Sequence, residues 1–310
     1  MKIGRREFLT GMAAGAGGLL LGCNGEMGAA GKPAVPSNFG PYEMVPLGQT
    51  KLKVSRVGLG TGMRGGMRRS NQTKLGKKRL EALLRGAYDR GIRWFDMADL
   101  YGSHPYLIPA MKGLPRDKYV IVSKIWWRRG GIPERERPAA HVVVERFLKE
   151  LKTDYIDLCL LHCVTSPDWP EQLKRQMDDL SKLRDKGVIR AHGVSCHSLP
   201  ALAACVDEPW VQSVHTRINP YGVKMDGPAE KVSPVLKRIH AAGKGVVGMK
   251  IIGEGQFRDD DEKRDKSVRY ALELGCVDTL LVGFEKLTEI DDLAARVRKV
   301  QRPVPAAESA

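Results

Sequence analysis

The chain has 310 residues, of which 42% are apolar, and a formal net charge of +15. This length and composition can fill the core of one large domain or two ordinary ones. The basic residues are scattered through helical segments, without an aromatic-interleaved stripe or a recognised binding motif. We therefore expect no nucleic-acid partner, and assign the charge to solvated helix faces and anionic small ligands.

The first 23 residues are typical of an export signal rather than of a folded domain. A charged start contains the twin arginine Arg5-Arg6, a short Gly/Ala-rich apolar stretch follows, and the motif LLGC ends at Cys23. This order resembles a twin-arginine signal peptide joined to a lipoprotein cleavage box. An uncleaved membrane helix is the weaker alternative, because the apolar stretch is short. We expect export by the twin-arginine route, lipid on Cys23, and a periplasmic or cell-surface location.

The segment that follows reads as a linker to one folded domain. Residues 24–44 are rich in Gly, Ala, Pro and Asn, which is typical of a flexible tether. We place the folded domain at 45–305 and a short tail at 306–310. Five cysteines follow Cys23, and their spacing matches no zinc or iron–sulfur pattern. We therefore expect buried thiols and no metal.

From about residue 54, strand-like and helix-like segments alternate without a break. The segments between strands carry helical periodicity, such as the i, i+3, i+4, i+7 pattern that runs from Leu80 to Ala87 before Gly91. Eight β/α units between residues 54 and 300 match the usual size of about 250 residues for a (β/α)8 TIM barrel. The runs expected to form strands are 54–62, 93–99, 119–125, 155–163, 188–196, 211–219, 245–252 and 276–284.

A doubly wound sheet is the competing fold. Residues 60–65 (GTGMRG) fit the pattern G-x-G-x-x-G after a strand. A polar stretch follows instead of an immediate helix, and an open sheet rarely runs to eight even units. We therefore interpret these glycines as a flexible loop at the rim of a single-domain barrel. In the last unit, Thr288 and Asp291 resemble a capping box that opens the final helix.

Ionisable residues end three successive strand-like runs. Asp96 and Tyr101 follow the second strand, Lys124 ends the third and His162 ends the fourth. Strands of a parallel barrel deliver such side chains to one rim. An ammonium can lower the pKa of a phenol, a carboxylate can keep that ammonium charged, and an imidazole can hydrogen-bond the reacting oxygen. The four residues form a workable proton-donating centre for carbonyl reduction, and an ion pair closing the barrel mouth is the structural alternative.

These segments resemble the aldo-keto reductase family, and the resemblance covers essentially all of 45–300. WFDMADLYG is similar to the family's Asp-x-Ala-x-x-Tyr-Gly segment, VSKIW to its lysine strand and LLHC to its Leu-His segment. The resemblance implies Tyr101 as the general acid, Lys124 and Asp96 as its pKa-lowering partners, and His162 as the orienting group. It further implies an NAD(P)H-linked oxidoreductase that reduces an aldehyde or ketone, or oxidises the alcohol.

The resemblance also implies a nicotinamide cofactor lying across the barrel mouth. Ser195 belongs to a segment similar to the family's Gly-x-Ser-Asn element, which contacts the carboxamide, with Cys196 in place of the asparagine. Gln212 matches a glutamine that the family uses on the same amide. Met249 takes the place of an aromatic residue that stacks on the ring, where a thioether can still pack.

The last unit departs most from the family. Gly283 is kept, but Glu285 falls where a basic residue often grips the 2′-phosphate, and Leu293 replaces an asparagine. Glu285 would repel a phosphate, whereas Lys286 or Lys250 could attract it. The family pattern favours NADP and the local charges favour NAD, with NADP slightly preferred.

The chain ends soon after the eighth helix, without the long loop that narrows the pocket of some family members. We expect an open mouth edged by Trp126, Trp127 and Arg217, which suits a small-molecule carbonyl or a larger, sugar-like substrate. Two other functions stay open. One is a non-catalytic cofactor-binding barrel that senses redox state, and the other is a cofactor-free, exported sugar-processing barrel.

Overall fold

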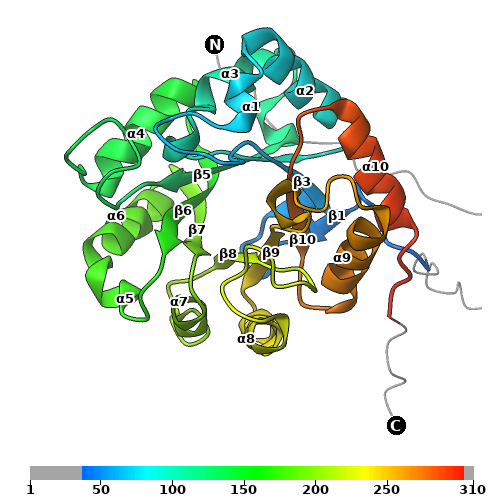
Figure 1. Cartoon of the computed structure of the whole chain (residues 1–310). Coiled ribbons are helices and arrows are strands. Elements are labelled where there is room, and N and C mark those ends of the chain that lie inside the picture. Colours follow the sequence, from blue (N-terminus) through cyan, green and yellow to red (C-terminus); the bar gives the residue numbers. More distant parts are fainter. Residues whose placement is uncertain (1–36, 304–310) are drawn as a thin grey trace, which may run out of the picture. The chain divides into compact units, whose positions relative to one another are not determined.

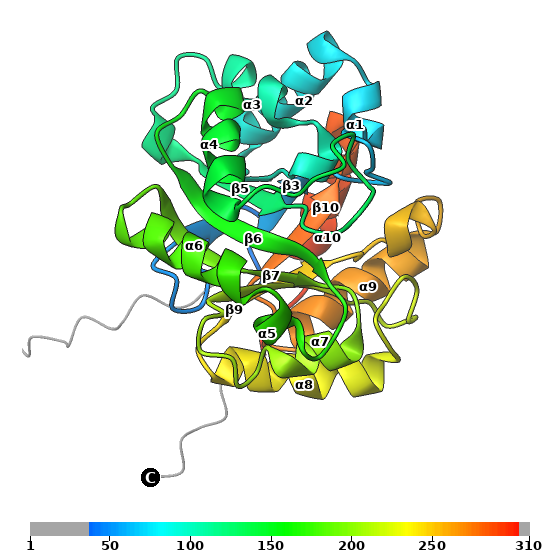
Figure 2. The ribbon, with the colours of Figure 1, turned by 90° about the vertical axis from the view of Figure 1, so that its left-hand side faces the viewer.

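A computed structural model of the chain describes residues 37–303. Eight parallel strands close into a barrel with helices around it, in the order β10-β3-β4-β5-β6-β7-β8-β9 (Figures 1 and 2). The expected single-domain (β/α)8 barrel is confirmed. The predicted export signal with Cys23, the first part of the tether and the final residues of the chain lie outside the described residues.

The barrel strands coincide with the eight runs expected from the sequence, and only β6 extends one residue beyond its run. Parallel strands are covered on both faces, so they appear in the sequence as short continuous apolar runs. The strands are β3 (Val57–Gly60), β4 (Trp94–Asp96), β5 (Val120–Ile125), β6 (Ile156–Val164), β7 (Ile189–Cys196), β8 (Ser213–Arg217), β9 (Gly245–Met249) and β10 (Thr279–Gly283).

Helices connect successive strands and bury one apolar face against the barrel. In α2 (Lys77–Arg90) the expected leucines are buried, and the helix ends at Gly91, whose φ of 113° suits glycine. Within the described residues no helix is long and apolar enough to cross a membrane. The other helices are α1 (Asn71–Lys74), α3 (His104–Ala110), α4 (Ala140–Leu151), α5 (Trp169–Gln172), α6 (Lys174–Asp185), α7 (Leu199–Ala204), α8 (Ala229–Ala241), α9 (Asp261–Glu273) and α10 (Leu287–Arg298).

A hairpin not expected from the sequence closes the amino-terminal end of the barrel. It consists of the antiparallel strands β1 (Met44–Pro46) and β2 (Lys53–Ser55). Its apolar side chains, including Leu47, join the cluster of residues that fills the barrel interior. Phe39 is also buried, and its N–H donates to the Val300 carbonyl at 3.0 Å. Residues 37–44 are therefore part of the folded domain, although their composition suggested a tether.

Candidate active site

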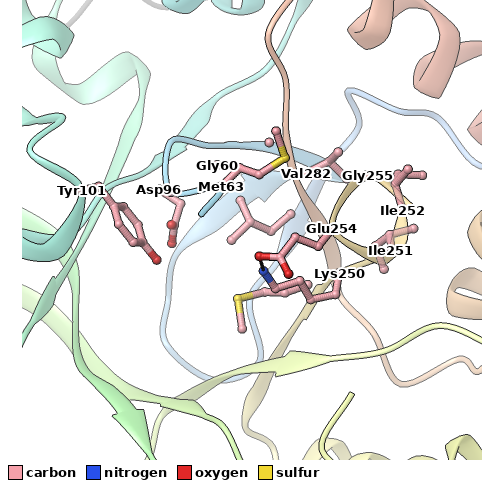
Figure 3. A pocket seen from close by; sticks show the side chains of 14 residues that line it. Gly60, Met63, Asp96, Tyr101, Lys250, Ile251, Ile252, Glu254, Gly255 and Val282 are labelled. Atoms are coloured by element: carbon pink, nitrogen blue, oxygen red, sulfur yellow. Dashed lines mark hydrogen bonds and ion pairs between the residues drawn. The ribbon is translucent and has the colours of Figure 1, made fainter. Parts of the chain in front are cut away.

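The four expected catalytic residues lie together at the carboxyl ends of adjacent strands. Asp96 ends β4, Lys124 lies on β5 and His162 on β6, while Tyr101 follows β4 on a short 3-10 turn. Lys124 Nζ forms an ion pair with Asp96 and also donates to the Met97 carbonyl at 3.1 Å. The Tyr101 hydroxyl lies 3.2 Å from His162 Nε2. Figure 3 shows Tyr101 and Asp96 at one side of the pocket that opens beside them.

Burial and the neighbouring charges set the protonation states of this cluster. Burial favours a neutral Asp96, but the Lys124 ammonium and a hydrogen bond with His215 outweigh it and lower the pKa of this carboxyl. Burial lowers the pKa of Lys124, against the opposing charge of Asp96. Burial and then the Lys124 charge lower the pKa of His162 well below its ordinary value. His162 is therefore a neutral imidazole at neutral pH.

The pKa of Tyr101 is raised, which is the reverse of the expectation from sequence. Burial of the phenol is the largest cause, followed by the negative charge of Asp96. The Lys124 ammonium, which lies over the face of the ring 5.0 Å from the centroid and is paired with Asp96, favours the phenolate but does not reverse this shift. Tyr101 is thus a neutral phenol that can give its proton to a strongly basic oxygen, such as a developing alkoxide.

His215 belongs to the same cluster, although the sequence analysis did not single it out. It is fully buried on β8, and its Nε2 lies 3.2 Å from Asp96 Oδ2. Asp96 therefore has a partner at each carboxylate oxygen, with Lys124 at Oδ1. The sequence contained a signal for this placement. Side chains alternate along a strand, so His215 shares a face with Arg217, which was expected at the barrel mouth.

The glycine-rich loop after β3 packs directly on Tyr101. A Cβ atom on Gly62 or Gly65 would overlap or crowd the Tyr101 ring. The loop is at the rim of the barrel, as expected. Its glycines allow the backbone to approach the ring closely. This packing explains the glycines without a phosphate-binding role.

An open cleft leads from Tyr101 across the carboxyl ends of β9 and β10 (Figure 3). Its walls combine apolar side chains with the charged groups of Asp96, Lys250 and Glu254. Met63, Ile252 and Val282 also line a second hollow that continues to Leu293 on α10. The two hollows form one elongated path from the catalytic residues to the outer helices. Glycine positions and apolar side chains along this path would accept a flat ring followed by an extended chain.

Three of the expected cofactor residues line this cleft. Met249, Lys250 and Gly283 all face it, and Lys250 Nζ is paired with Glu254 at 3.0 Å. Lys286 does not line either hollow, and its side chain is exposed. Lys286 therefore borders neither part of the path.

The other three expected cofactor residues do not line the cleft. Ser195 is buried and accepts the Cys163 N–H at 2.9 Å. Cys196 is also buried, and its Sγ lies 3.5 Å from Cys205 Sγ beside α7. Gln212 precedes β8 at the amino-terminal end of the strand and accepts the His192 N–H at 3.1 Å. From that end of the barrel, Gln212 cannot reach a ligand at the mouth.

None of the three expected substrate residues lines the cleft. The Trp126 ring meets the His162 ring edge-on, with centroids 5.5 Å apart. Trp127 Nε1 donates to the His162 carbonyl at 2.8 Å. Arg217, at the end of β8, is held in an ion pair with Asp226. The two tryptophans thus support the catalytic histidine as well as bordering the opening.

The amino-terminal end of α10 is capped by a residue that the sequence analysis did not choose. Glu289 accepts the N–H groups of Glu285 at 2.7 Å and Lys286 at 3.2 Å, so the expected cap by Thr288 is replaced by one from Glu289. Glu285 accepts a hydrogen bond from Asn71 Nδ2 at 2.8 Å. Two carboxylates consequently lie at the outer end of the path.

The five cysteines within the described residues are unpaired thiols, all of them buried, as expected. Between residues 37 and 303, no group of His, Cys, Asp and Glu side chains is arranged to hold a metal ion. Burial raises the pKa of Cys163, next to the catalytic histidine, to about 11. This thiol is therefore not a candidate nucleophile.

Comparison with known sequences identifies relatives over most of the barrel. Residues 56–280 match the profile of the Aldo/keto reductase family. The chain is 32% identical over 206 residues to aldo-keto reductase YhdN of Bacillus subtilis, covering 63% of this chain and 58% of YhdN. It is 30% identical over 173 residues to the NADH-specific methylglyoxal reductase of Escherichia coli, covering 49% of this chain and 51% of that protein. The chain thus spans somewhat over half the length of these curated relatives.

Solved structures share the fold. PA4992 of Pseudomonas aeruginosa, ascribed to the aldo-keto reductases, superposes with a TM-score of 0.68 at 25% identity, covering 84% of this chain and 97% of that one. An aldo/keto reductase from Klebsiella pneumoniae in complex with NADP and acetate superposes with a TM-score of 0.60 at 22% identity, covering 83% and 90%.

The ion pair inside the barrel generates a prediction about stability. Lys124→Met leaves the Asp96 carboxylate buried beside a neutral side chain, and we expect the free energy of unfolding to fall by about 3–5 kcal/mol. Adding Asp96→Leu removes the unpaired charge, so the double variant should recover most of that loss. Urea unfolding followed by far-UV circular dichroism measures both changes. A double variant as unstable as Lys124→Met would contradict this account of the pair.

Proposed function

The chain belongs to the aldo/keto reductase family, and from this premise we propose that it catalyses the NAD(P)H-dependent reduction of an aldehyde or ketone, with Tyr101 as the general acid. The observation that carries the proposal is the contact of Tyr101 with His162, beside the Lys124–Asp96 pair, where the cleft begins. The same groups would serve the reverse reaction, in which an alcohol is oxidised and Tyr101 acts as the base.

The cleft suits a nicotinamide nucleotide. Gly283 and Met249 provide a smooth wall near Tyr101, and the path continues between Ile252 and Val282 toward α10. The relatives support this proposal, since one solved structure holds NADP and one sequence relative is NADH-specific. When bound there, the nicotinamide supplies a hydride to the carbonyl carbon.

The chain's own residues supply the proton and stabilise the charge. Tyr101 gives its hydroxyl proton to the carbonyl oxygen as negative charge develops on it. The Lys124 ammonium, fixed over the ring by Asp96, stabilises the phenolate that remains. Neutral His162 contacts the phenol oxygen through Nε2 and fixes the position of the group that donates the proton.

Removing the phenolic hydroxyl tests the role of Tyr101. In Tyr101→Phe, turnover of an aldehyde with NADH or NADPH should fall by about 10²–10⁴-fold, because no other group is placed to protonate the oxygen. Binding of the reduced cofactor, followed by its fluorescence, should stay within about twofold of the wild type. Because burial raises the pKa of Tyr101, ionisation of this phenol should cause no loss of the wild-type rate below pH 10, and a loss in that range would report deprotonation of Lys124, whose pKa burial lowers. Undiminished turnover in Tyr101→Phe would refute the assignment.

The outer end of the cleft favours NADH over NADPH. An adenosine that follows the path away from Tyr101 meets α10, where the carboxylates of Glu285 and Glu289 would repel a 2′-phosphate. Two arginines at this end are already engaged. Arg258 lies 3.6 Å from Glu285, and Arg264 is paired with Asp292 at 2.9 Å. The slight preference for NADP expected from the family pattern is therefore reversed in this proposal.

This preference can be shifted by one substitution. Glu289→Gln keeps an oxygen to accept the Glu285 and Lys286 N–H groups but removes the charge. We expect the ratio of NADPH to NADH in kcat/KM and in dissociation constant to rise about tenfold. Glu273→Gln, an exposed residue at the end of α9, makes the same charge change elsewhere and should leave the ratio unchanged. A wild-type enzyme that binds NADPH more tightly than NADH would contradict the charge argument.

We also propose that the protein is exported by the twin-arginine route and held at the membrane surface by lipid on Cys23. The sequence alone supports this, through Arg5-Arg6 and the LLGC motif. Export in the folded state would carry a bound nucleotide out of the cytosol with the protein. Cells that express Cys23→Ala should release the protein from membranes, whereas Arg5→Lys with Arg6→Lys should retain an uncleaved precursor. Unchanged fractionation and processing of both variants would overturn this proposal.

A further inference from the structure

Two arginine-rich loops flank the catalytic tyrosine. They are residues 61–70 after β3 and 126–139 after β5, and together they contain seven arginines and two glutamates. The loops contact each other, because the Met67 N–H donates to the Gly131 carbonyl at 2.6 Å. Five of the arginines are exposed and have no ion pair among residues 37–303. We call this group the arginine rim: Arg64, Arg69, Arg128, Arg129 and Arg135.

The acidic residues around the mouth do not neutralise the arginine rim. Asp99 and Glu134 are both paired with Arg68, which is not part of the rim. Asp226 is paired with Arg217, and Glu254 with Lys250. Among the carboxylates of the two loops, Glu136 has no ion pair in the described part of the chain, and it is a single charge. The mouth thus keeps an excess of positive charge.

One member of the arginine rim, Arg128, acts on a group near His162. The Nε2 atom of His197 lies 3.3 Å from the Sγ atom of Cys163, the residue that follows His162 in the chain. The ring centroids of His197 and His162 are 6.5 Å apart. Burial lowers the pKa of His197 to about 3, and the charges of Arg217, Lys250 and Arg128 contribute to this shift. The guanidinium of Arg128 therefore lies near enough to influence a group beside His162.

The loop after β5 does not border the proposed cofactor cleft. The cleft is lined by residues 249–255 and 281–283, together with the start of the loop after β3. None of the lining residues belongs to 126–139. Arg64 is nearer the cleft, since its charge helps to lower the pKa of Glu254. The arginines at 128, 129 and 135 are thus placed to act on the substrate rather than on the cofactor.

We propose that the substrate is a carbonyl compound carrying an anionic group, a carboxylate or a phosphate, which the arginine rim attracts and orients toward Tyr101. This inference rests on the proposed reductase function and names its substrate class. Unpaired guanidinium groups around an opening raise the local concentration of an anionic ligand and bind its oxygens in a planar geometry. Trp126, beside His162, offers an apolar surface for the remainder of the molecule.

A matched pair of aldehydes tests the inference. The probes are 4-formylbenzoate and its neutral methyl ester; the ester group activates its aldehyde more strongly than the carboxylate does, so intrinsic reactivity works against the expected preference. We expect kcat/KM for the anion to exceed that for the ester by about tenfold at low salt, and the difference to shrink in 0.5 M NaCl. Glyceraldehyde 3-phosphate compared with glyceraldehyde forms the second pair. The ratio of kcat/KM for the charged compound to that for its neutral partner is compared between the two pairs. The pair with the larger ratio identifies carboxylate or phosphate as the preferred anion.

Variants separate the arginine rim from the overall charge of the protein. In Arg128→Gln/Arg129→Gln/Arg135→Gln the preference for the anion should fall to about twofold or less. Lys186→Gln/Lys237→Gln/Arg269→Gln removes the same charge from exposed positions toward the opposite end of the barrel, and should keep the preference. Equal kcat/KM for the charged and neutral members of both pairs, or a preference that survives in the rim variant, would overturn the inference. So would weaker NADH binding in the rim variant without a change in the aldehyde ratio.

Failure of the reductase proposal is distinguishable from failure of this one. If no aldehyde is reduced with either nucleotide, the proposed function fails. The role of the arginine rim is then tested by measuring the binding of a charged and a neutral ligand. Isothermal titration with 4-(hydroxymethyl)benzoate and with its methyl ester gives that result without turnover. Tighter binding of the anion to the wild type, lost in the rim variant, supports the inference. Equal binding of the two compounds refutes it.

Discussion

The ion pair between Lys124 and Asp96 inside the barrel is the interaction on which the site depends. Removing two charges from water costs several kcal/mol per ion, and attraction alone offsets this only with good geometry and further hydrogen bonds. The barrel provides those partners, since Lys124 also reaches the Met97 carbonyl and Asp96 also contacts His215. Three strands thereby fix one ammonium over the face of Tyr101.

The rest of the mouth is organised around that fixed tyrosine. The glycines after β3 let the loop lie against its ring, and His162 holds its hydroxyl from the other side. The arginines of the loop after β5 do not border the elongated cleft. A hydride donor and an anionic carbonyl compound could consequently reach Tyr101 together without competing for one surface. The rigid barrel supplies the positions, and the loops supply the specificity.

The sequence predicted the barrel and the clustering of Asp96, Tyr101, Lys124 and His162 because both depend on patterns along single strands. Buried parallel strands appear as apolar runs, and the ionisable residues at their ends are conspicuous. Properties that depend on neighbours in space were not accessible in this way. The direction in which Cys196 faces and the contact of His215 with Asp96 depend on how distant segments pack. The raised pKa of Tyr101 likewise depends on burial by segments distant in the chain. Gln212, in contrast, stands at the start of its expected run and could have been placed at the amino-terminal end of the barrel from the sequence.

The central claim is that this site transfers hydride from a nicotinamide to a carbonyl carbon, and isotope labelling tests it most directly. The protein would reduce an aldehyde with NADH that carries deuterium on the transferred C4 position, and the alcohol would be analysed by mass spectrometry and proton NMR. We predict one deuterium on the former carbonyl carbon, and none there when unlabelled NADH is used in D2O. Absence of the label from that carbon in the first experiment, or its appearance there from D2O, would contradict the account.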